Sequence, residues 1–215
     1  MNMESYKNIA QHLTTNGVAL VAVSKVQKVE SILQLYESGQ KDFGENYVQE
    51  LIEKYEQLPK DIRWHFIGHL QSNKVKYIAP FVHMIQSVDS EKLLVEINKQ
   101  AIKNNRKIDC LLQVHIAKED SKFGFTIEEA EQFLAEKTAE KYSNISLKGL
   151  MGMASFDDDN TTIKKEFLLL KNLFDKYRSA SFNTLCMGMS GDYELAIECG
   201  SNMVRLGSVI FGRRQ

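Results

Sequence analysis

The stretch VALVAVSKV, residues 18–26, is a short apolar run that ends in a polar turn. Its β-branched and aliphatic residues predict a buried strand over Val18–Ser24. An open doubly wound sheet usually carries a glycine-rich phosphate loop after its first strand. Here Ser24-Lys25-Val26 stands in that place. The stretch therefore favours a parallel β/α barrel over an open nucleotide-binding sheet.

The same rhythm continues along the chain, where short strand-like runs alternate with segments of helical periodicity. Ser90 is the predicted N-cap of one helix, and the residues from Ile163 to Phe174 carry an apolar stripe at helical spacing. Eight units of about 27 residues each predict an α/β fold, a single (β/α)8 barrel of the TIM type. The further strands are predicted at Asp42–Gly44, Trp64–Gly68, Met84–Val88, Cys110–Ile116, Leu147–Met151, Thr184–Met187 and Met203–Leu206.

The composition excludes several classes of protein. The net charge is −1, from 27 basic and 28 acidic residues, so no global field attracts nucleic acid. The longest apolar run is far shorter than the ~20 residues of a membrane span, and the first residues do not resemble a signal peptide. Cys110, Cys186 and Cys199 lack metal or redox spacing, which suits free buried thiols. We expect a cytoplasmic protein without nucleic acid or membrane partners.

Candidate site residues stand where predicted strands end, because the site of such a barrel lies at the carboxyl ends of its strands. Lys25 ends the first strand, and a lysine amine that is partly desolvated loses proton affinity and can condense with a carbonyl. Ser190-Gly191 and Gly207-Ser208 follow the last two strands, where this fold often binds phosphate. Together they predict a site for a phosphorylated aldehyde or ketone, although each alone is compatible with a solvated lysine or an ordinary turn.

Arg205 lies two residues before Gly207 on the last predicted strand, so both point to the same side. A guanidinium stays protonated. Facing a pyridine nitrogen, it would donate a hydrogen bond and leave the ring a weaker electron sink. A salt bridge at the barrel rim is the alternative interpretation of this arginine.

Several longer stretches carry a resemblance to a known family. The chain resembles the YggS/PROSC group of pyridoxal 5′-phosphate (PLP) homeostasis proteins, which share the fold of the alanine racemase N-terminal domain. The resemblance covers nearly the whole chain. The matching stretches are AVSK (22–25), DFGENYVQEL (42–51), WHFIGHLQSNKVK (64–76), SVDS (87–90), GLMGM (149–153) and MGMSGDYELAIECGSNMVRLGSVIFGRR (187–214).

This resemblance implies a role for each candidate residue. Lys25 would hold PLP as an internal aldimine, Arg205 would face the pyridine nitrogen, and the serines and glycines would bind the phosphate. Asn46 would lie near the ring or phosphate and His69 in the pocket after the third strand, with a satisfied polar group at a strand end as the alternative for both. The site residues so implied are Lys25, Asn46, His69, Ser190, Gly191, Arg205, Gly207 and Ser208.

The implied function is PLP homeostasis, with apo-PLP enzymes as recipients and without robust turnover of amino acids. The alternative is a PLP-dependent amino-acid racemase, which needs acid–base groups on both faces of the α-carbon. In alanine racemase a second domain supplies one of them, a tyrosine, whereas we expect one monomeric PLP-binding domain over residues 1–215. Tyr47 and Tyr193 are the substitutes within this chain. A Schiff-base aldolase would use Lys25 and the phosphate turns but leaves Arg205 unexplained.

Other polar residues have lesser expected roles. Lys122 follows the fifth predicted strand, and we hypothesise that this second amine receives or hands on PLP. His65, His83 and His115 lack HExxH spacing, so we expect histidines of the core or rim. The run from Asp157 to Asp159 is interpreted as a solvated loop. We therefore expect no metal site.

Overall fold

The structure, a computed structural model, describes residues 3–118, 123–156 and 159–212. The strands of these residues form a closed parallel barrel in which each strand pairs with the next and β8 pairs with β1. The predicted (β/α)8 barrel is confirmed, and every predicted strand overlaps an observed one. The strands are β1 Ala19–Val23, β2 Asp42–Glu45, β3 Arg63–Phe66, β4 Met84–Val88, β5 Ile108–His115, β6 Ile145–Met153, β7 Thr184–Cys186 and β8 Met203–Leu206.

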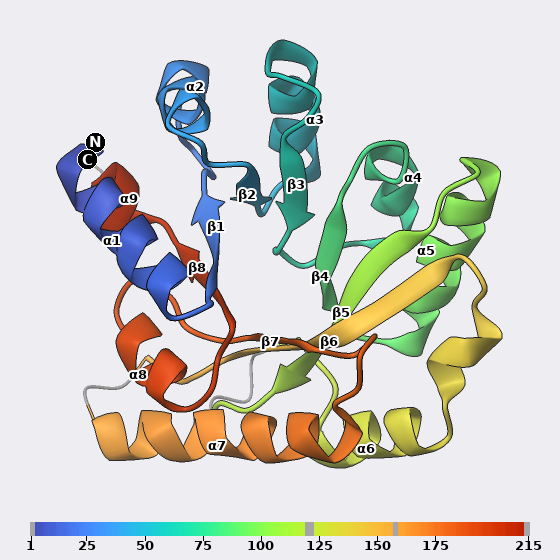
Figure 1. The fold of residues 1–215 in the computed structure, drawn as a ribbon. Helices are drawn as coiled ribbons and strands as arrows, with labels where there is room; N and C mark the ends of the chain where they lie inside the picture. The colour runs from blue at the N-terminus through green and yellow to red at the C-terminus, as the bar shows by residue number, and fades with distance from the viewer. Residues whose placement is uncertain (1–2, 119–122, 157–158, 213–215) are drawn as a thin grey trace.

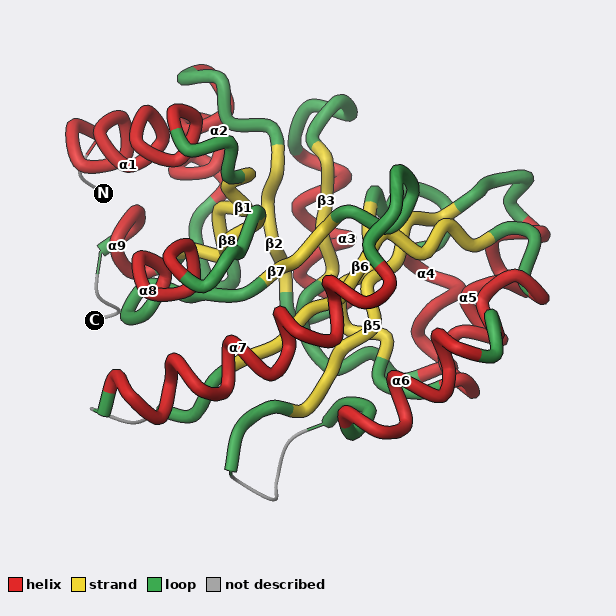
Figure 2. Tube along the Cα trace, turned by 60° about the horizontal axis from the view of Figure 1, so that its bottom comes forward, coloured by secondary structure: helices red, strands yellow, loops and turns green. Residues whose placement is uncertain are grey.

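Helices surround the strands on the outside (Figures 1 and 2). Helices α1 and α9 pack against each other (Figure 1). Within the described ranges, no helix has the length and apolar content to cross a lipid bilayer. The helices are α1 Met3–Thr15, α2 Val29–Glu37, α3 Val48–Gln57, α4 Val75–Ile78, α5 Glu91–Lys103, α6 Ile127–Ala135, α7 Asn160–Tyr177, α8 Tyr193–Glu198 and α9 Ser208–Phe211, with 3-10 turns at Ser72–Lys74 and Thr138–Lys141.

Local sequence signals explain where several helices begin and which face they bury. Ser90 caps α5, because its Oγ accepts the Leu93 N–H at 3.4 Å, as predicted. Thr126 and Glu129 form a reciprocal capping box at the start of α6. The predicted stripe of α7 is confirmed, because its four members are buried against the barrel: Ile163, Phe167, Leu170 and Phe174.

Side chains alternate between two apolar clusters on opposite faces of the barrel wall. In β5, Cys110 and Leu112 belong to the larger cluster and Leu111 to the smaller one. In β7, Leu185 belongs to the larger cluster and Cys186 to the smaller one. Because successive strand residues point to opposite faces, the larger cluster lies under the helices and the smaller one inside the barrel. The interior also contains Met84 and Met151, packed against Met153 and Met203.

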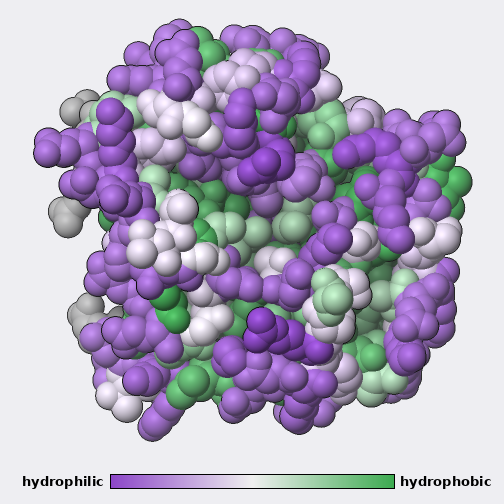
Figure 3. Space-filling view, viewed as in Figure 1, coloured by the Kyte–Doolittle hydropathy of each residue, from purple (hydrophilic) through white to green (hydrophobic). Residues whose placement is uncertain are grey.

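The outer surface is mainly hydrophilic, and hydrophobic residues gather towards the centre of the face seen in Figure 3. The three cysteines are free and buried, which confirms the prediction for Cys110, Cys186 and Cys199. No disulfide or bound ion is therefore needed to explain the packing, since a domain of this length buries roughly 70% of its unfolded surface.

Candidate functional site

A cavity of about 770 Å³ opens at the carboxyl ends of the barrel strands. This size lies within the range of roughly 300–1,000 Å³ that is usual for small-molecule sites. Its walls include residues at or just after the ends of β1, β2, β3, β6, β7 and β8. Every residue that the sequence suggested for the site lines this cavity except His69, and these residues are Lys25, Asn46, Ser190, Gly191, Arg205, Gly207 and Ser208.

Lys25 stands in a tight turn directly after β1. Ser24 is fully buried, and the Gln27 N–H donates to the Ser24 carbonyl oxygen at 3.0 Å, which closes the turn. Lys25 itself is partly buried and borders the cavity. The barrel wall thus fixes where the lysine leaves the strand.

The two turns that were expected to bind phosphate are joined by a hydrogen bond. The Gly207 N–H donates to Ser190 Oγ at 3.1 Å, so the hydroxyl hydrogen of Ser190 stays available to a ligand. Asp192 accepts the Met189 N–H at 2.6 Å, which fixes the loop before α8. Gly191 borders open space, because an added Cβ would meet no atom within 4 Å. The turns therefore form a preformed wall with room for an anion.

The charge of the cavity also favours an anion. Among the described residues that line it, the charged side chains are Lys25, Asp192 and Arg205. Burial raises the pKa of Asp192, although its hydrogen bond with the Met189 N–H and the charge of Arg205 act in the opposite direction. Two basic groups therefore face a single carboxyl group.

Arg205 is buried and is held by the neighbouring strands. Its Nη1 donates to the Cys186 carbonyl oxygen at 3.2 Å and to Cys186 Sγ at 2.9 Å, and its Nη2 donates to the Gly152 carbonyl oxygen at 3.1 Å. A guanidinium carries five N–H groups, so two have no partner among the described residues. Arg205 is thus fixed in place and still has donors for a ligand.

A chain of hydrogen bonds continues from Arg205 through the barrel interior. The Cys186 thiol donates to Gln86 Oε1 at 3.2 Å, which agrees with the raised pKa that burial gives this thiol. Gln86 Nε2 donates to His65 Nδ1 at 2.9 Å, and His65 Nε2 then donates to Asp42 Oδ1 at 3.0 Å. We call these five residues, Arg205, Cys186, Gln86, His65 and Asp42, the polar column.

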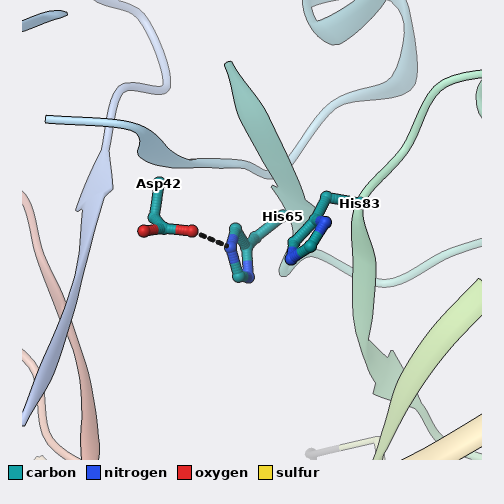
Figure 4. Close-up of side chains that lie close together, drawn as sticks. All are labelled: Asp42, His65 and His83. Atoms are coloured by element: carbon teal, nitrogen blue, oxygen red, sulfur yellow. Dashed lines mark hydrogen bonds and ion pairs between the residues drawn. The ribbon is translucent and has the colours of Figure 1, made fainter. Parts of the chain in front are cut away.

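The Asp42 end of the polar column is part of the cluster shown in Figure 4. Asp42, His65 and His83 each place one oxygen or ring nitrogen within 4.8 Å of the other two, and the two imidazole rings meet edge to face. Arg63 contacts both carboxylate oxygens of Asp42. Burial acts to raise the pKa of Asp42, but the hydrogen bonds from Arg63 and His65 and the charge of Arg63 outweigh it and lower this pKa below its usual range. An ion-pair network accounts for this cluster without a metal ion.

His69 lies apart from the main cavity, in a neighbouring one of about 560 Å³. Asn46 borders both cavities. The His69 ring stacks on Phe123 with 3.7 Å between ring centroids, and its Nδ1 lies 2.9 Å from Asp89. The structure therefore does not bring His69 together with Lys25.

Two sequence hypotheses concern residues outside the described ranges, namely Lys122 and the pair Asp157 and Asp158. Asp159 is described, and it caps α7 by accepting the Thr161 N–H. Conversely, sequence reasoning missed the residues that hold Lys25 and Arg205 in place. These residues are Glu45, Glu50, Lys54, Gln86 and Cys186. One signal was available in the sequence, because Glu50 and Lys54 are oppositely charged and stand at helical i, i+4 spacing.

Comparison with known proteins assigns this architecture to a family. Residues 3–215 match the family model described as alanine racemase, N-terminal domain. A protein of Pasteurella multocida called pyridoxal phosphate homeostasis protein is 39% identical over 206 residues, which cover 93% of this chain and 88% of the relative. PipY of Synechococcus elongatus, solved with PLP bound, is 31% identical with a TM-score of 0.81, and the match covers 91% of this chain and 93% of that chain.

Alanine racemases share the fold at lower identity. The enzyme of Bartonella henselae, solved with covalently bound pyridoxal phosphate, has a TM-score of 0.77 at 16% identity. That match covers 97% of this chain and 57% of the racemase, and at this identity it shows the fold alone. Considered with the family model and the closer relatives, the chain belongs to the alanine racemase N-terminal domain family and, within it, to the pyridoxal phosphate homeostasis proteins.

Proposed function

We propose that this protein binds PLP covalently through Lys25 and serves PLP homeostasis without robust turnover of amino acids. The observation that carries the proposal is the meeting of Lys25, Arg205 and the two serine-glycine turns in one cavity. The relatives named pyridoxal phosphate homeostasis protein and the PLP complex of PipY support it. Buried free cysteines support a reducing compartment, and we place the protein in the cytoplasm.

The residues present fit PLP. Open space beside Gly191 and the spare hydroxyl hydrogen of Ser190 suit a phosphate. Asn46 adds a buried Oδ1 that has no hydrogen-bond partner among the described residues. When bound, PLP supplies an aldehyde, and the Lys25 amine can condense with it and release water.

Arg205 favours binding of PLP without catalysis on an amino acid. A guanidinium donates a hydrogen bond but cannot transfer its proton at neutral pH, so a pyridine nitrogen beside it stays unprotonated. An unprotonated ring stabilises negative charge on a bound amino acid less well. The contacts with Cys186 and Gly152 hold the guanidinium at the cavity, which supports this role.

The racemase alternative needs a second acid–base group opposite the lysine. No tyrosine is found among the described residues that line the main cavity. Tyr47 borders the neighbouring cavity, and the Tyr193 hydroxyl donates to Glu194 at 3.2 Å. The test is to incubate PLP-loaded protein with single enantiomers of amino acids. Rapid loss of optical activity would favour the racemase.

The direct test of the proposal is chemical trapping. Protein incubated with PLP is reduced with borohydride, digested and analysed by mass spectrometry. We expect one major adduct, on the peptide that contains Lys25. A protein that binds no added PLP, or that carries the adduct only on other lysines, would contradict the proposal.

We expect Ser190→Ala to weaken the binding of PLP by about one to two orders of magnitude, because a lost hydrogen bond to a charged group is worth roughly 1.5–3 kcal/mol. Pyridoxal, which lacks the phosphate, should bind the variant and the wild type alike. Titration calorimetry with both ligands measures the difference. Ser143→Ala, at an exposed serine before β6, is the control. Equal losses for both ligands would show that Ser190 does not contact the phosphate.

Apo-PLP enzymes are the recipients that we propose, with Lys122 as the residue that hands on PLP. We expect Lys122→Ala to slow the transfer of PLP to an apo-enzyme, measured by the recovery of that enzyme's activity. Wild-type transfer rates in the variant would contradict this role. We also propose a monomer, which light scattering during gel filtration checks.

A further inference from the structure

A buried group of charged residues contacts the turn that carries Lys25. Lys54, on α3, is 4% exposed. Its Nζ donates to the Ser24 carbonyl oxygen at 2.6 Å, to Glu45 Oε1 at 2.7 Å and to Glu50 Oε1 at 2.6 Å. An ammonium has three hydrogens, so all three are used. We call Lys54, Glu45 and Glu50 the turn clamp.

The turn clamp contacts both peptide bonds of Lys25. The Ser24 carbonyl, which accepts from Lys54, belongs to the peptide bond before Lys25. The Val26 N–H belongs to the peptide bond after it, and this group donates to Glu50 Oε1 at 2.5 Å. Lys54 and Glu50 are themselves an ion pair at i, i+4 on α3. One pair of side chains thus fixes the backbone on both sides of the lysine.

The conformation of this turn needs such support. Val26 has φ +60°, a region that glycine or asparagine usually occupies and that is unfavourable for a β-branched residue. Val26 is 66% exposed, so packing of its side chain does not hold it there. The hydrogen bond from its N–H to Glu50 is therefore a contact that can keep the residue in this region.

The turn clamp buries charged groups, and removing them from water costs free energy of desolvation. Glu45 is fully buried, and its Oε2 has no hydrogen-bond partner among the described residues. Burial raises the pKa of Glu45 although Lys54 and Ser24 act to lower it. Buried ion pairs often stabilise a fold no better than apolar residues of similar volume. The stability of the fold therefore does not account for this buried ion pair, whereas a role in positioning Lys25 does.

We propose that Glu50 and Lys54 are positioning residues for Lys25, because they hold its turn in the conformation that presents Nζ to the aldehyde of bound PLP. This inference rests on the proposed function of Lys25. A nucleophile that is held in place gains reactivity, since less conformational freedom is lost when its bond forms. Without the turn clamp, Val26 would relax towards negative φ and Lys25 would lose its fixed direction.

The test compares two ligands that differ only in the aldehyde, PLP and pyridoxine 5′-phosphate. In the wild type, PLP should bind more tightly because only it can bond to Lys25. We expect Glu50→Ala to reduce this advantage about tenfold, which corresponds to about 1.4 kcal/mol, and to slow the formation of the borohydride-trapped adduct. Binding of pyridoxine 5′-phosphate should stay within about twofold of the wild type, because the cavity itself is unchanged. Glu53→Ala, at an exposed position on the same helix, is the matched control.

Two further variants separate positioning from general damage to the fold. Glu50→Gln keeps an oxygen that can accept the Val26 N–H, so it should retain most of the affinity advantage of PLP over pyridoxine 5′-phosphate. Adding Val26→Gly to Glu50→Ala should restore adduct formation, because glycine adopts positive φ without strain. The inference would be overturned if Glu50→Ala weakened the binding of both ligands equally or left the affinity advantage of PLP unchanged. It would also be overturned if adding Val26→Gly did not restore adduct formation. A wild type that binds both ligands equally and forms no adduct would instead refute the proposed function.

Discussion

Lys25→Ala is expected to abolish the borohydride-stable adduct and to weaken PLP binding by about one to two orders of magnitude, or roughly 1.4–2.7 kcal/mol. In the proposed function the lysine amine bonds covalently to the aldehyde, whereas different residues of the cavity, Ser190 and Gly207, bind the phosphate. Some PLP should therefore remain bound without the covalent bond. The variant should bind PLP and pyridoxine 5′-phosphate with equal affinity.

Mass spectrometry after reduction and calorimetric titration with both ligands measure these effects. Lys28→Ala is the matched control, because this exposed lysine precedes α2 and caps no helix through its side chain. It should form the adduct as the wild type does. A variant at Lys25 that still gives a stoichiometric adduct would show that another lysine holds PLP. In that case Lys122 would be the first residue to examine.

The sequence predicted the barrel well because barrel formation depends on local patterns. Each strand is a short apolar run, and each long helix carries an apolar stripe at helical spacing. The strands at Met84–Val88 and Met203–Leu206 have the predicted bounds. Strand alternation also placed Arg205 and Gly207 at the same cavity. Such predictions need only the periodicity of the backbone.

The position of His69 depends on more than the strand pattern. The carboxyl ends of all strands share one face of the barrel, so a polar residue after β3 seemed a neighbour of the first and last strands. Ile67 directly follows β3 and lines the main cavity, but His69 lies two residues further along, where its ring stacks on Phe123 and its Nδ1 lies beside Asp89. His69 therefore borders a neighbouring cavity, which meets the main one at Asn46.

The supporting contacts could not be read from one sequence, because they join distant positions. Cys186 and Gln86 are 100 residues apart in the chain, and Ser24 and Lys54 are 30 apart. The pair of Glu50 and Lys54 has the spacing of an ordinary surface ion pair on a helix. Only the packing of α3 against the barrel shows that this lysine is buried.

The second large effect is a loss of stability, expected when Asp42 of the polar column is replaced. Asp42→Asn should lower the free energy of unfolding by about 2 kcal/mol near neutral pH, because hydrogen bonds to a charged group are worth roughly 1.5–3 kcal/mol. The asparagine replaces one carboxylate oxygen with an NH2 group, so it cannot accept both hydrogen bonds from Arg63, and it carries no charge to pair with the guanidinium. Denaturant unfolding measures the loss. Asp61→Asn is the control, because Asp61 pairs with Lys41 at the surface, and such pairs contribute about 0–1 kcal/mol.

The pH dependence of this loss identifies its cause. The pKa of Asp42 is lowered in the folded protein, so the carboxylate stabilises the fold fully above its unfolded pKa of about 3.9 and loses this effect as the pH falls towards the folded value. The difference between wild type and Asp42→Asn should therefore narrow by about 1 kcal/mol between about pH 6 and pH 3, since one pKa unit corresponds to about 1.36 kcal/mol. Groups that both proteins share cancel in this comparison. A difference that stays constant over the same range would mean that the ion pair with Arg63 does not hold the carboxylate, and that the asparagine disturbs packing instead.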